Sequence, residues 1–301
     1  ISKDTGETID SAQLSIADTD GIFTNISVSG DYIKFKVASV PDTGANGIIS
    51  IKNSAGTIMW SWHIWVWPDD LTPVTITNKT GVDYNILPVN LATKKDASTS
   101  GKMYDWFYQW GRPTPMLPPM SYNSATDATN YGVKTFTKST ACATTYGEAI
   151  KNPHTFYGDS GNSKANWFGS SSYYNLWDAN CTSTGNSDNT VVKTVYDPCP
   201  VGFKMPNGNT FTYFSGSNMV GSFNNGCYFK RNADDTTGVF FPASGYRAFS
   251  IGSLKEVGFV GFVWLSSANS QNIVCTLHFD SSYVNPQYHR VRSFGFSVRP
   301  V

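Results

Sequence analysis

The sequence predicts a β-rich α+β protein with a small N-terminal β-sandwich followed by a larger domain. Short segments in which apolar and polar residues alternate cluster at both ends of the chain. Charged residues make up only 15% of the chain while aromatic residues also reach 15%, a balance typical of extracellular β-rich proteins. A length of 301 residues corresponds to about two domains, each with its own core.

Residues 11–67 are predicted to form the strands of the sandwich. In "DYIKFKVA" (31–38), Ile33, Phe35 and Val37 fall on one face and two lysines on the other, and "FTNISVSG" (23–30) alternates in the same way. "NGIISIKNSAGTIMW" (46–60) predicts a hairpin that turns at 54–56. We therefore expect an antiparallel sandwich of immunoglobulin-like size or smaller over residues 1–67. Because so short a sandwich has a small core, we expect it to pack against the neighbouring domain or to lack strands at its N-terminal side.

The last strand of the sandwich, within "GTIMWSWHIWVWPDD" (56–70), is crowded with tryptophan. Alternation places Trp60, Trp62, Ile64 and Val66 on one face, and Met59, Ser61, His63, Trp65 and Trp67 on the other. Both faces are mostly apolar, which favours a strand covered on two sides by packed domains. An exposed platform for a sugar is the alternative. His63, the one histidine of this strand, is predicted to be a hydrogen-bonded core residue rather than a ligand.

The prolines and acids of "WPDDLTPV" (67–74) predict a linker at 68–74 and a second domain over 75–301. Residues 111–120 carry four prolines and should be irregular. A capping box from Thr145 to Glu148 predicts a helix in "YGEAIKNPH" that ends at Asn152-Pro153, and a second short helix is predicted over 208–216. The final third should return to strands at 226–231, 238–249, 258–267, 272–280 and 293–301, with a turn at 232–238.

Charge and hydropathy exclude two classes of partner. Lys plus Arg and Asp plus Glu are equal at 22 each, so no field steers the chain toward nucleic acid or an anionic membrane. The longest apolar run, 258–265, is far shorter than the ~20 residues that span a bilayer, which predicts no transmembrane segment. The chain begins at Ile1 without a visible signal peptide, as expected of a processed or trimmed product.

Cysteines and histidines give no metal-site pattern. The five cysteines include no CxxC pair and the four histidines are scattered, so we predict no metal and no cofactor. One or two disulfides fit an oxidising compartment, and at least one thiol must stay unpaired. Their connectivity cannot be read from the sequence.

The motifs of common enzymes are also absent. The chain has no G-x-S-x-G, no H-E-x-x-H, no P-loop and no dinucleotide fingerprint, and its scattered carboxylates nominate no glycosidase pair. Asp234 and Asp235 fit a solvated turn better than a cation site. We predict a protein that is not an enzyme.

Two groups of residues are candidates for ligand binding. In the loop-rich region 111–190, Trp167, Phe168, Tyr173 and Tyr174 stand among small polar residues, a composition that suits adaptable contacts with sugars or peptides. Trp177 nearby is predicted to be core. Tyr246 and Arg247, with Trp264, form a second candidate group. A structural role is favoured for this group, with Arg247 bonded to a buried carboxylate or carbonyl. Arg299 is likewise predicted to be structural.

Eight motifs occur in order: "GTIMWSWHIWV" (56–66), "FYQWGRPTPM" (107–116), "AIKNPHTFY" (149–157), "NLWD" (175–178), "VYDPCPVGFKMP" (195–206), "FPASGYR" (241–247), "FVWLSS" (262–267) and "GFSVRPV" (295–301). The series resembles the Bacteroidales surface proteins that end in a FISUMP domain, commonly described as fimbrillin-like or fimbrial tip proteins. The resemblance covers roughly 56–301. This chain departs from the family in lacking a "DRNLGA"-like block, where it has "ILPVNLAT" (86–93), and a cysteine near Pro300.

The resemblance implies an immunoglobulin/transthyretin-like sandwich followed by a C-type-lectin-like domain related in fold to formylglycine-generating enzymes. It also implies export through a lipoprotein route to the cell surface, as part of a fimbrium or the outer membrane of a Gram-negative bacterium. Stalk or adaptor subunits are the implied partners, joined by donor-strand addition. The chain stops just after "GFSVRPV", as a tip subunit without a donor segment would.

The function that follows is a non-catalytic adhesin, a fimbrial tip subunit that recognises a glycan or a host protein. The alternative is a free-standing carbohydrate-binding surface lipoprotein. A degenerate enzyme of the formylglycine-generating type ranks third, because no cysteine pair matches that family's active site. The Glu-Pro-Asn and Trp-Asn-Asp motifs of calcium-dependent lectins are missing as well.

Overall fold

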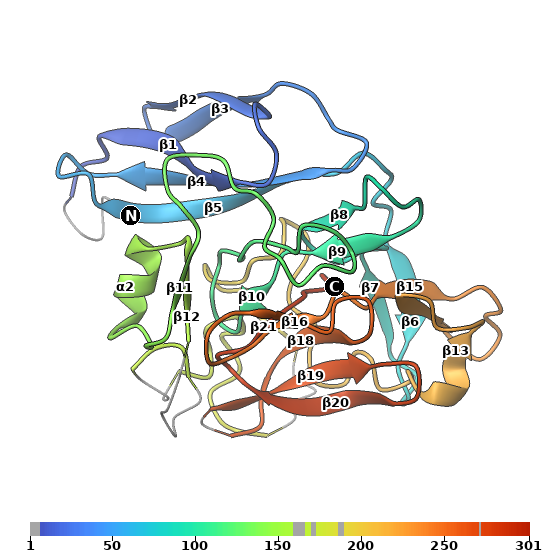
Figure 1. The fold of residues 1–301 in the computed structure, drawn as a ribbon. Helices are drawn as coiled ribbons and strands as arrows, with labels where there is room; N and C mark the ends of the chain where they lie inside the picture. The colour runs from blue at the N-terminus through green and yellow to red at the C-terminus, as the bar shows by residue number, and fades with distance from the viewer. Residues whose placement is uncertain (1–6, 159–165, 170–172, 186–189, 271) are drawn as a thin grey trace.

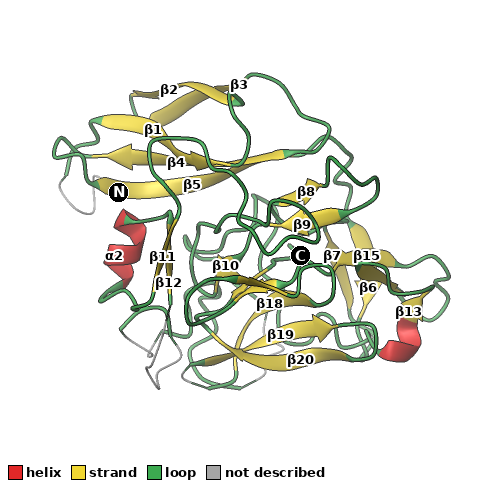
Figure 2. Ribbon diagram, in the orientation of Figure 1, coloured by secondary structure: helices red, strands yellow, loops and turns green. Residues whose placement is uncertain are grey.

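The computed structural model describes residues 7–158, 166–169, 173–185, 190–270 and 272–301, and shows a mostly β protein with many small, mainly antiparallel sheets (Figure 1). Within these ranges the helices are α2 (Tyr146–Lys151) and the short 3₁₀ helix η1 (Gly216–Asn218), so almost all regular structure is strand (Figure 2). Neither helix has the length or the apolar character needed to cross a membrane. The β-rich part of the predicted fold class is confirmed.

Five strands form two sheets at the N-terminal end. Strands β1, β4 and β5 make one sheet in the order β1-β4-β5, and a β2-β3 hairpin makes the other. Their facing sides pack around Ile22, Phe23 and Ala45. The hairpin predicted at 46–60 is confirmed, and its turn is closed by a hydrogen bond of 2.9 Å from Gly56 N to Asn53 O. The strands are β1 (Ser11–Ala17), β2 (Phe23–Ser29), β3 (Tyr32–Val37), β4 (Ala45–Lys52) and β5 (Ile58–Val66).

The two outer edges of the β1-β4-β5 sheet differ. A segment of the larger part crosses the β1 edge: Ala17 and Tyr131 exchange backbone hydrogen bonds of 2.7 and 2.9 Å (Figure 1). Gly132 permits this approach, because its φ is +119° and a Cβ there would lie 2.9 Å from the Ser15 carbonyl oxygen. At the opposite edge, β5 pairs with β4 and with no other strand among the described residues.

The larger part of the chain contains six small sheets within the described ranges. They are the four-stranded sheet β10-β21-β16-β17, the three-stranded sheets β13-β14-β15 and β18-β19-β20, and the pairs β6-β7, β8-β9 and β11-β12, the last of them parallel. Their bounds are β6 (Val74–Thr77), β7 (Asp83–Ile86), β8 (Thr93–Lys95), β9 (Met103–Asp105), β10 (Tyr108–Gln109), β11 (Thr137–Ser139), β12 (Thr155–Tyr157), β13 (Met219–Val220), β14 (Gly226–Phe229), β15 (Val239–Pro242), β16 (Tyr246–Arg247), β17 (Leu254–Lys255), β18 (Gly261–Ala268), β19 (Ile273–Phe279), β20 (Val284–Val291) and β21 (Gly295–Phe296).

The C-terminal segment runs through the middle of the larger part (Figure 1). Its carbonyl oxygens accept hydrogen bonds from distant segments, including 2.8 Å from Leu91 N to Val298 O. Arg299 is fully buried, lies 4.0 Å from the centre of the Phe241 ring and donates to Asn90 Oδ1 at 2.6 Å. Its predicted structural role is confirmed.

Packing is continuous between the sandwich and the rest. Ile16 and Ile48 of the sandwich belong to the same buried cluster as Trp106, Trp110 and Trp264. A second cluster is rich in phenylalanine and lies under β14, β15 and β19. The domain boundary at 68–74 stays a prediction.

The first predicted helix is confirmed in detail. Thr145 is the N-cap of α2, and its side chain accepts from Glu148 N. The Glu148 carboxylate returns to the backbone N–H of Thr144, one residue earlier than in an ideal capping box. The helix ends at Lys151, with Asn152 as its C-cap, next to the predicted stop at Asn152-Pro153.

The second predicted helix, 208–216, is wrong. The segment forms a series of turns instead, each closed by a hydrogen bond from the N–H of residue i+3 to the carbonyl of residue i, such as Thr212 N to Asn209 O and Phe214 N to Phe211 O. The Asn207 side chain starts them by accepting from Asn209 N at 3.0 Å. The i, i+3 spacing then stacks Phe211 and Phe214, whose ring centroids lie 5.4 Å apart, in the phenylalanine cluster.

Strand β20, which contains Pro286, is not among the predicted strands. Proline cannot donate a hydrogen bond to a sheet but is tolerated at an edge, and β20 is the edge strand of β18-β19-β20.

No disulfide is formed between the cysteines of the described chain. The turn at 232–238 is confirmed, with the Asp235 carboxylate accepting from Arg231 Nε at 2.7 Å and from Gly238 N at 3.1 Å.

Asp105, at the end of β9, is a buried hydrogen-bonding centre of the larger part. Its carboxylate accepts from Asn90 Nδ2, Ser244 Oγ and Ser297 Oγ at 2.7 Å each and from Thr93 Oγ1 at 2.5 Å. The side chain is fully buried. It therefore connects the end of β9 with segment 90–93 and with the segments that contain Ser244 and Ser297.

We predict that Asp105→Ala lowers the free energy of unfolding by about 3 kcal/mol or more, because it leaves several buried donors without an acceptor. Urea denaturation monitored by tryptophan fluorescence measures the change. Asp69→Ala is the control, since its exposed ion pair with Lys95 should contribute less than about 1 kcal/mol. Equal effects of the two variants would contradict this role for Asp105.

Candidate functional site

Strand β5 is shared by the two parts of the molecule. On one face, Ile64 and Val66 pack against the core of the sandwich. On the other, the Trp65 indole donates to Thr93 O at 3.0 Å, and His63 contacts Tyr108. The prediction of a strand covered on two sides is thus confirmed for this half of β5. Trp60 and Trp62, nearer its start, stay partly exposed.

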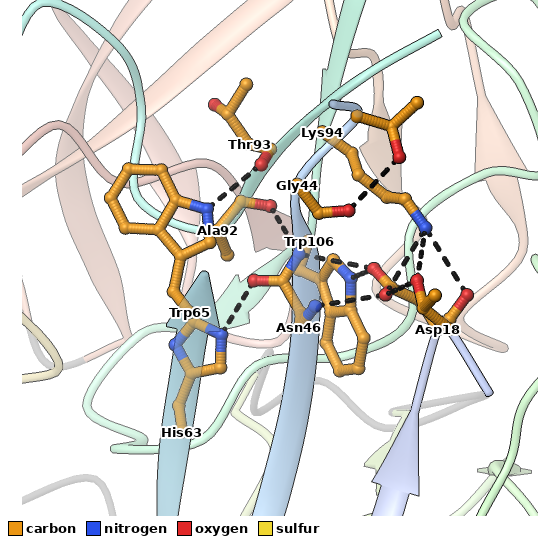
Figure 3. A network of polar contacts seen from close by, with 11 residues as sticks. Asp18, Gly44, Asn46, His63, Trp65, Ala92, Thr93, Lys94 and Trp106 are labelled. Atoms are coloured by element: carbon orange, nitrogen blue, oxygen red, sulfur yellow. Dashed lines mark hydrogen bonds and ion pairs between the residues drawn. The ribbon is translucent and has the colours of Figure 1, made fainter. Parts of the chain in front are cut away.

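A polar network around Asp18 fixes β5 and its sheet against the larger part (Figure 3). The Asp18 carboxylate accepts from the backbone N–H of Asn46 at 3.0 Å and from the Trp106 indole at 2.7 Å. Lys94 Nζ lies 3.3 Å from the same carboxylate. These partners come from β4, β8 and the segment after β9, so the carboxylate joins both parts of the chain.

The network extends to His63 through Asn46. The Asn46 amide nitrogen donates to Asp18 and to Ala92 O, which leaves its oxygen to accept from His63 Nε2 at 2.9 Å. His63 Nδ1 then accepts from the Tyr108 hydroxyl at 3.0 Å. Burial lowers the pKa of His63 to about 3, so the ring is neutral at pH 7. Its predicted role as a hydrogen-bonded core residue is confirmed.

A groove of about 740 Å³ lies beside the first half of β5, opposite α2. Aromatic and aliphatic side chains make up most of its wall, and among the described residues Lys151 and Glu7 are its charged members. The wall contains Glu7, Thr57, Ile58, Met59, Trp60, Trp62, Tyr146, Gly147, Ile150, Lys151, Val195 and Tyr196. We call this the β5–α2 groove.

A second groove, of about 270 Å³, lies on the sandwich side of β5. Ile33 and Phe35 of β3 face Ile49 and Ile64 across it, and Trp62 lines both grooves. We call it the β3–β5 groove. The free edge of β5 therefore runs between two apolar hollows.

Of the four candidates from the loop-rich region, Trp167 and Phe168 lie behind the β5–α2 groove, where both contact Tyr146. Tyr173 contacts Phe168, and Tyr174 lies beside Arg292. Trp167 and Phe168 are fully or almost fully buried, Tyr174 is half-buried and Tyr173 is 48% exposed. The burial of Trp167 and Phe168 leaves neither ring a face for stacking a ligand. Residues 159–165, 170–172 and 186–189 of the same region lie outside the described residues.

Ring contacts join these residues to β5. Trp60 contacts Tyr196 with ring centroids 5.9 Å apart, and Tyr196 contacts Tyr146 at 4.7 Å. Tyr146 in turn contacts Trp167 at 5.4 Å. Trp167 thus packs beneath Tyr146 and Tyr196, which line the groove. Trp177 is fully buried, as predicted.

Tyr246 and Arg247 lie elsewhere. Tyr246 packs edge-on against Phe262 and Phe294. Arg247 is fully buried and donates to the carbonyl oxygens of Leu117 and Gly252 and to the Asp127 carboxylate. The favoured structural role of Arg247 is confirmed.

Sequence reasoning missed Tyr146, Ile150 and Tyr196. The i, i+4 spacing of Tyr146 and Ile150 marks an apolar face of α2, but which surface that face meets is set by the fold. Within the described ranges, no group of three or more histidine, cysteine, aspartate or glutamate side chains could hold a metal ion.

Comparison of the chain with protein-family models, with curated proteins and with solved structures gave no match. The family resemblance stays a prediction based on its eight ordered motifs.

We predict that stability falls as the pH drops from about 6.5 toward 3, partly through His63. Its pKa is near 6.5 in the unfolded chain and about 3 in the fold, so the unfolded state gains a proton in this window and the folded state does not. His63→Gln should flatten the stability–pH curve there, by an amount on the order of a few kcal/mol.

Urea titrations at several pH values test this. His154, whose pKa burial lowers to about 4, is present in both proteins, so the difference between the two curves isolates His63. Parallel curves for wild type and variant would show that the ring is not held neutral.

Proposed function

We propose that this protein is a non-catalytic surface adhesin, a fimbrial tip subunit of the outer surface of a Gram-negative bacterium, that joins its neighbour by β-strand addition. The observation that carries the proposal is the free edge of β5 between two apolar grooves. In finer fold terms, we propose an immunoglobulin/transthyretin-like sandwich followed by a C-type-lectin-like domain. The two facing sheets at the N-terminal end support the first assignment, and the eight ordered motifs support the second.

An added strand fits this edge physically. Successive side chains of a strand point to opposite faces, so a segment paired with β5 would send alternate side chains into the β5–α2 groove and the β3–β5 groove. Backbone hydrogen bonds to β5 would supply affinity, and the two grooves would select apolar side chains.

Exposed apolar surface supports the same site. Tyr32 is 74% exposed, Trp62 39% and Phe35 36%, and all three line the β3–β5 groove. Proteins usually cover or charge the edges of their sheets, as segment 131–134 does for β1. On the other side of the same sheet, β5 pairs with no further strand among the described residues, and an apolar strand edge of this kind is typical of an interaction site.

The cysteines favour a non-catalytic protein. Burial raises the pKa of the Cys181, Cys199 and Cys227 thiols, which disfavours the thiolate that nucleophilic or redox chemistry requires. The best-connected buried carboxylates, Asp18 and Asp105, are each occupied by several donors.

The test is an assembly assay. Purified full chain is mixed with a fimbrial stalk subunit whose donor strand is free, and the products are run on a detergent gel with and without heating. We expect a heat-labile, detergent-resistant complex. Trp62→Glu should abolish it by placing a charge between the two grooves, whereas Val201→Glu, at a position 98% exposed, should not.

Hydrogen exchange gives an independent reading: the β5 amides that do not pair with β4 should gain protection in the complex, whereas those paired with β4 are already protected in the free protein. If wild-type protein forms no complex with such subunits, the tip assignment fails. The free-standing carbohydrate-binding lipoprotein then becomes the better account, with Trp60 and Trp62 as its sugar platform. That account predicts sugar binding that Trp62→Glu weakens.

A further inference from the structure

Arg290 differs from the other five arginines of the chain. Arg112, Arg247, Arg292 and Arg299 are buried, and Arg231 pairs with Asp235. Arg290, on β20, is half-buried, and no carboxylate of the described residues lies within ion-pair distance of it. Its one hydrogen bond, from Nη1 to the carbonyl oxygen of His289, is long at 3.4 Å. The guanidinium therefore keeps most of its five N–H donors unused.

Aromatic rings hold this guanidinium in place. Its Cζ lies 4.2 Å from the centre of the Tyr288 ring, 5.6 Å from that of Phe262 and 5.9 Å from that of Phe294. Cation–π contacts engage the flat faces of the group and leave the N–H edges available. A positioned cation with free donors is suited to bidentate binding of a carboxylate.

A groove of about 310 Å³ lies beside Arg290, where the end of β20 pairs with the start of β19. Its wall is otherwise mostly apolar, formed by Phe249, Ile273, His289, Val291 and Phe294. Phe249 is 38% exposed and contacts Phe294, with ring centroids 5.2 Å apart. The volume is at the lower end of the range for ligand pockets, about 300–1,000 Å³, which suits one small ring.

We propose that this groove binds a carboxylate-bearing pyranose, with the carboxylate on Arg290 and the apolar face of the sugar ring on Phe249. Charge complementarity selects the carboxylate, and the exposed aromatic face selects the C–H face of the ring. The inference names a ligand class for the adhesin proposed above, and so rests on that function. Its site is separate, because β20 lies at the end of the molecule away from β1–β5 (Figure 1). A strand on β5 and a sugar at β20 could thus be bound together.

The test compares methyl β-glucuronide with methyl β-glucoside, two probes that differ mainly in the carboxylate. The full chain is titrated with each at low salt by calorimetry or ligand-observed NMR. We expect a millimolar dissociation constant for the glucuronide and binding at least about tenfold weaker for the glucoside. Added salt should weaken the first and not the second.

Variants assign the site. Arg290→Gln should weaken glucuronide binding about tenfold or more, and Arg290→Lys should be intermediate because it keeps the charge without the planar fork. Phe249→Ala should weaken both sugars. Lys255→Gln, which removes an exposed cation outside the groove, is the matched control. Thermal unfolding of each variant checks that it is folded.

Wild-type protein that binds neither sugar, or binds both equally, overturns the proposal. So does an Arg290→Gln variant that is folded and binds the glucuronide like wild type. If Arg290→Gln does not fold, Phe249→Ala decides, since unchanged binding by that variant also overturns the site. None of these results touches the assembly assay, whose critical residue is Trp62.

Discussion

The carboxylate of Asp18 is the contact on which the arrangement of the molecule depends. It is buried where β1 ends and accepts hydrogen bonds from Asn46 of the sandwich and from Trp106 of the larger part, with Lys94 as its counter-ion. A buried carboxylate is strongly unfavourable unless all its partners are present, so the two parts cannot slide or rotate against each other without losing this balance. An apolar interface alone would tolerate several registers. The Asp18 network selects one, and it thereby fixes the direction in which β5 presents its outer edge.

That fixed geometry gives the molecule apolar grooves with different chemistry at its two ends. The β5 edge lies between apolar grooves lined by Trp62 and its neighbours, which suits an extended apolar segment. The groove at the end of β20 combines a guanidinium held by aromatic rings with an exposed ring, which suits a small anionic ligand. The β1 edge is covered by segment 131–134 and offers neither. The subunit that we propose, with a docking site at one end and a ligand site at the other, needs this kind of asymmetry.

Local signals in the sequence predicted much of the fold. Period-two alternation located the strands of the sandwich, and the side chains of Thr145 and Glu148 located α2, because both signals depend on neighbours a few residues away.

Predictions failed where packing between residues distant in the sequence determines the local structure. Residues 208–216 form turns because Phe211 and Phe214 are drawn into one cluster. β20 keeps Pro286 because it lies at an edge. Trp167 and Phe168 share the small polar neighbours of a binding loop, yet they support the β5–α2 groove from within. Contacts such as that of Trp60 with Tyr196 cannot be read from the sequence, because the two residues are far apart along the chain.

The arginines explain how so irregular a chain can still be well buried. Carbonyl oxygens outside helices and sheets need donors, and one guanidinium offers five. Arg112 donates to the carbonyl oxygens of Thr155, Ala149 and Asn152, and thereby closes the end of α2 onto β12. Arg299 does the same for Leu87 and Phe240. Burial lowers the pKa of Arg112 to about 10 and that of Arg299 to about 9, so both groups stay protonated at neutral pH and keep every donor. The N–H donors of both groups are used in hydrogen bonds within the fold.

Among the described residues, Arg290 forms no hydrogen bonds that join distant segments, and most of its donors remain available at the surface. That difference in use, more than its charge, is why we propose Arg290 as a ligand-binding group.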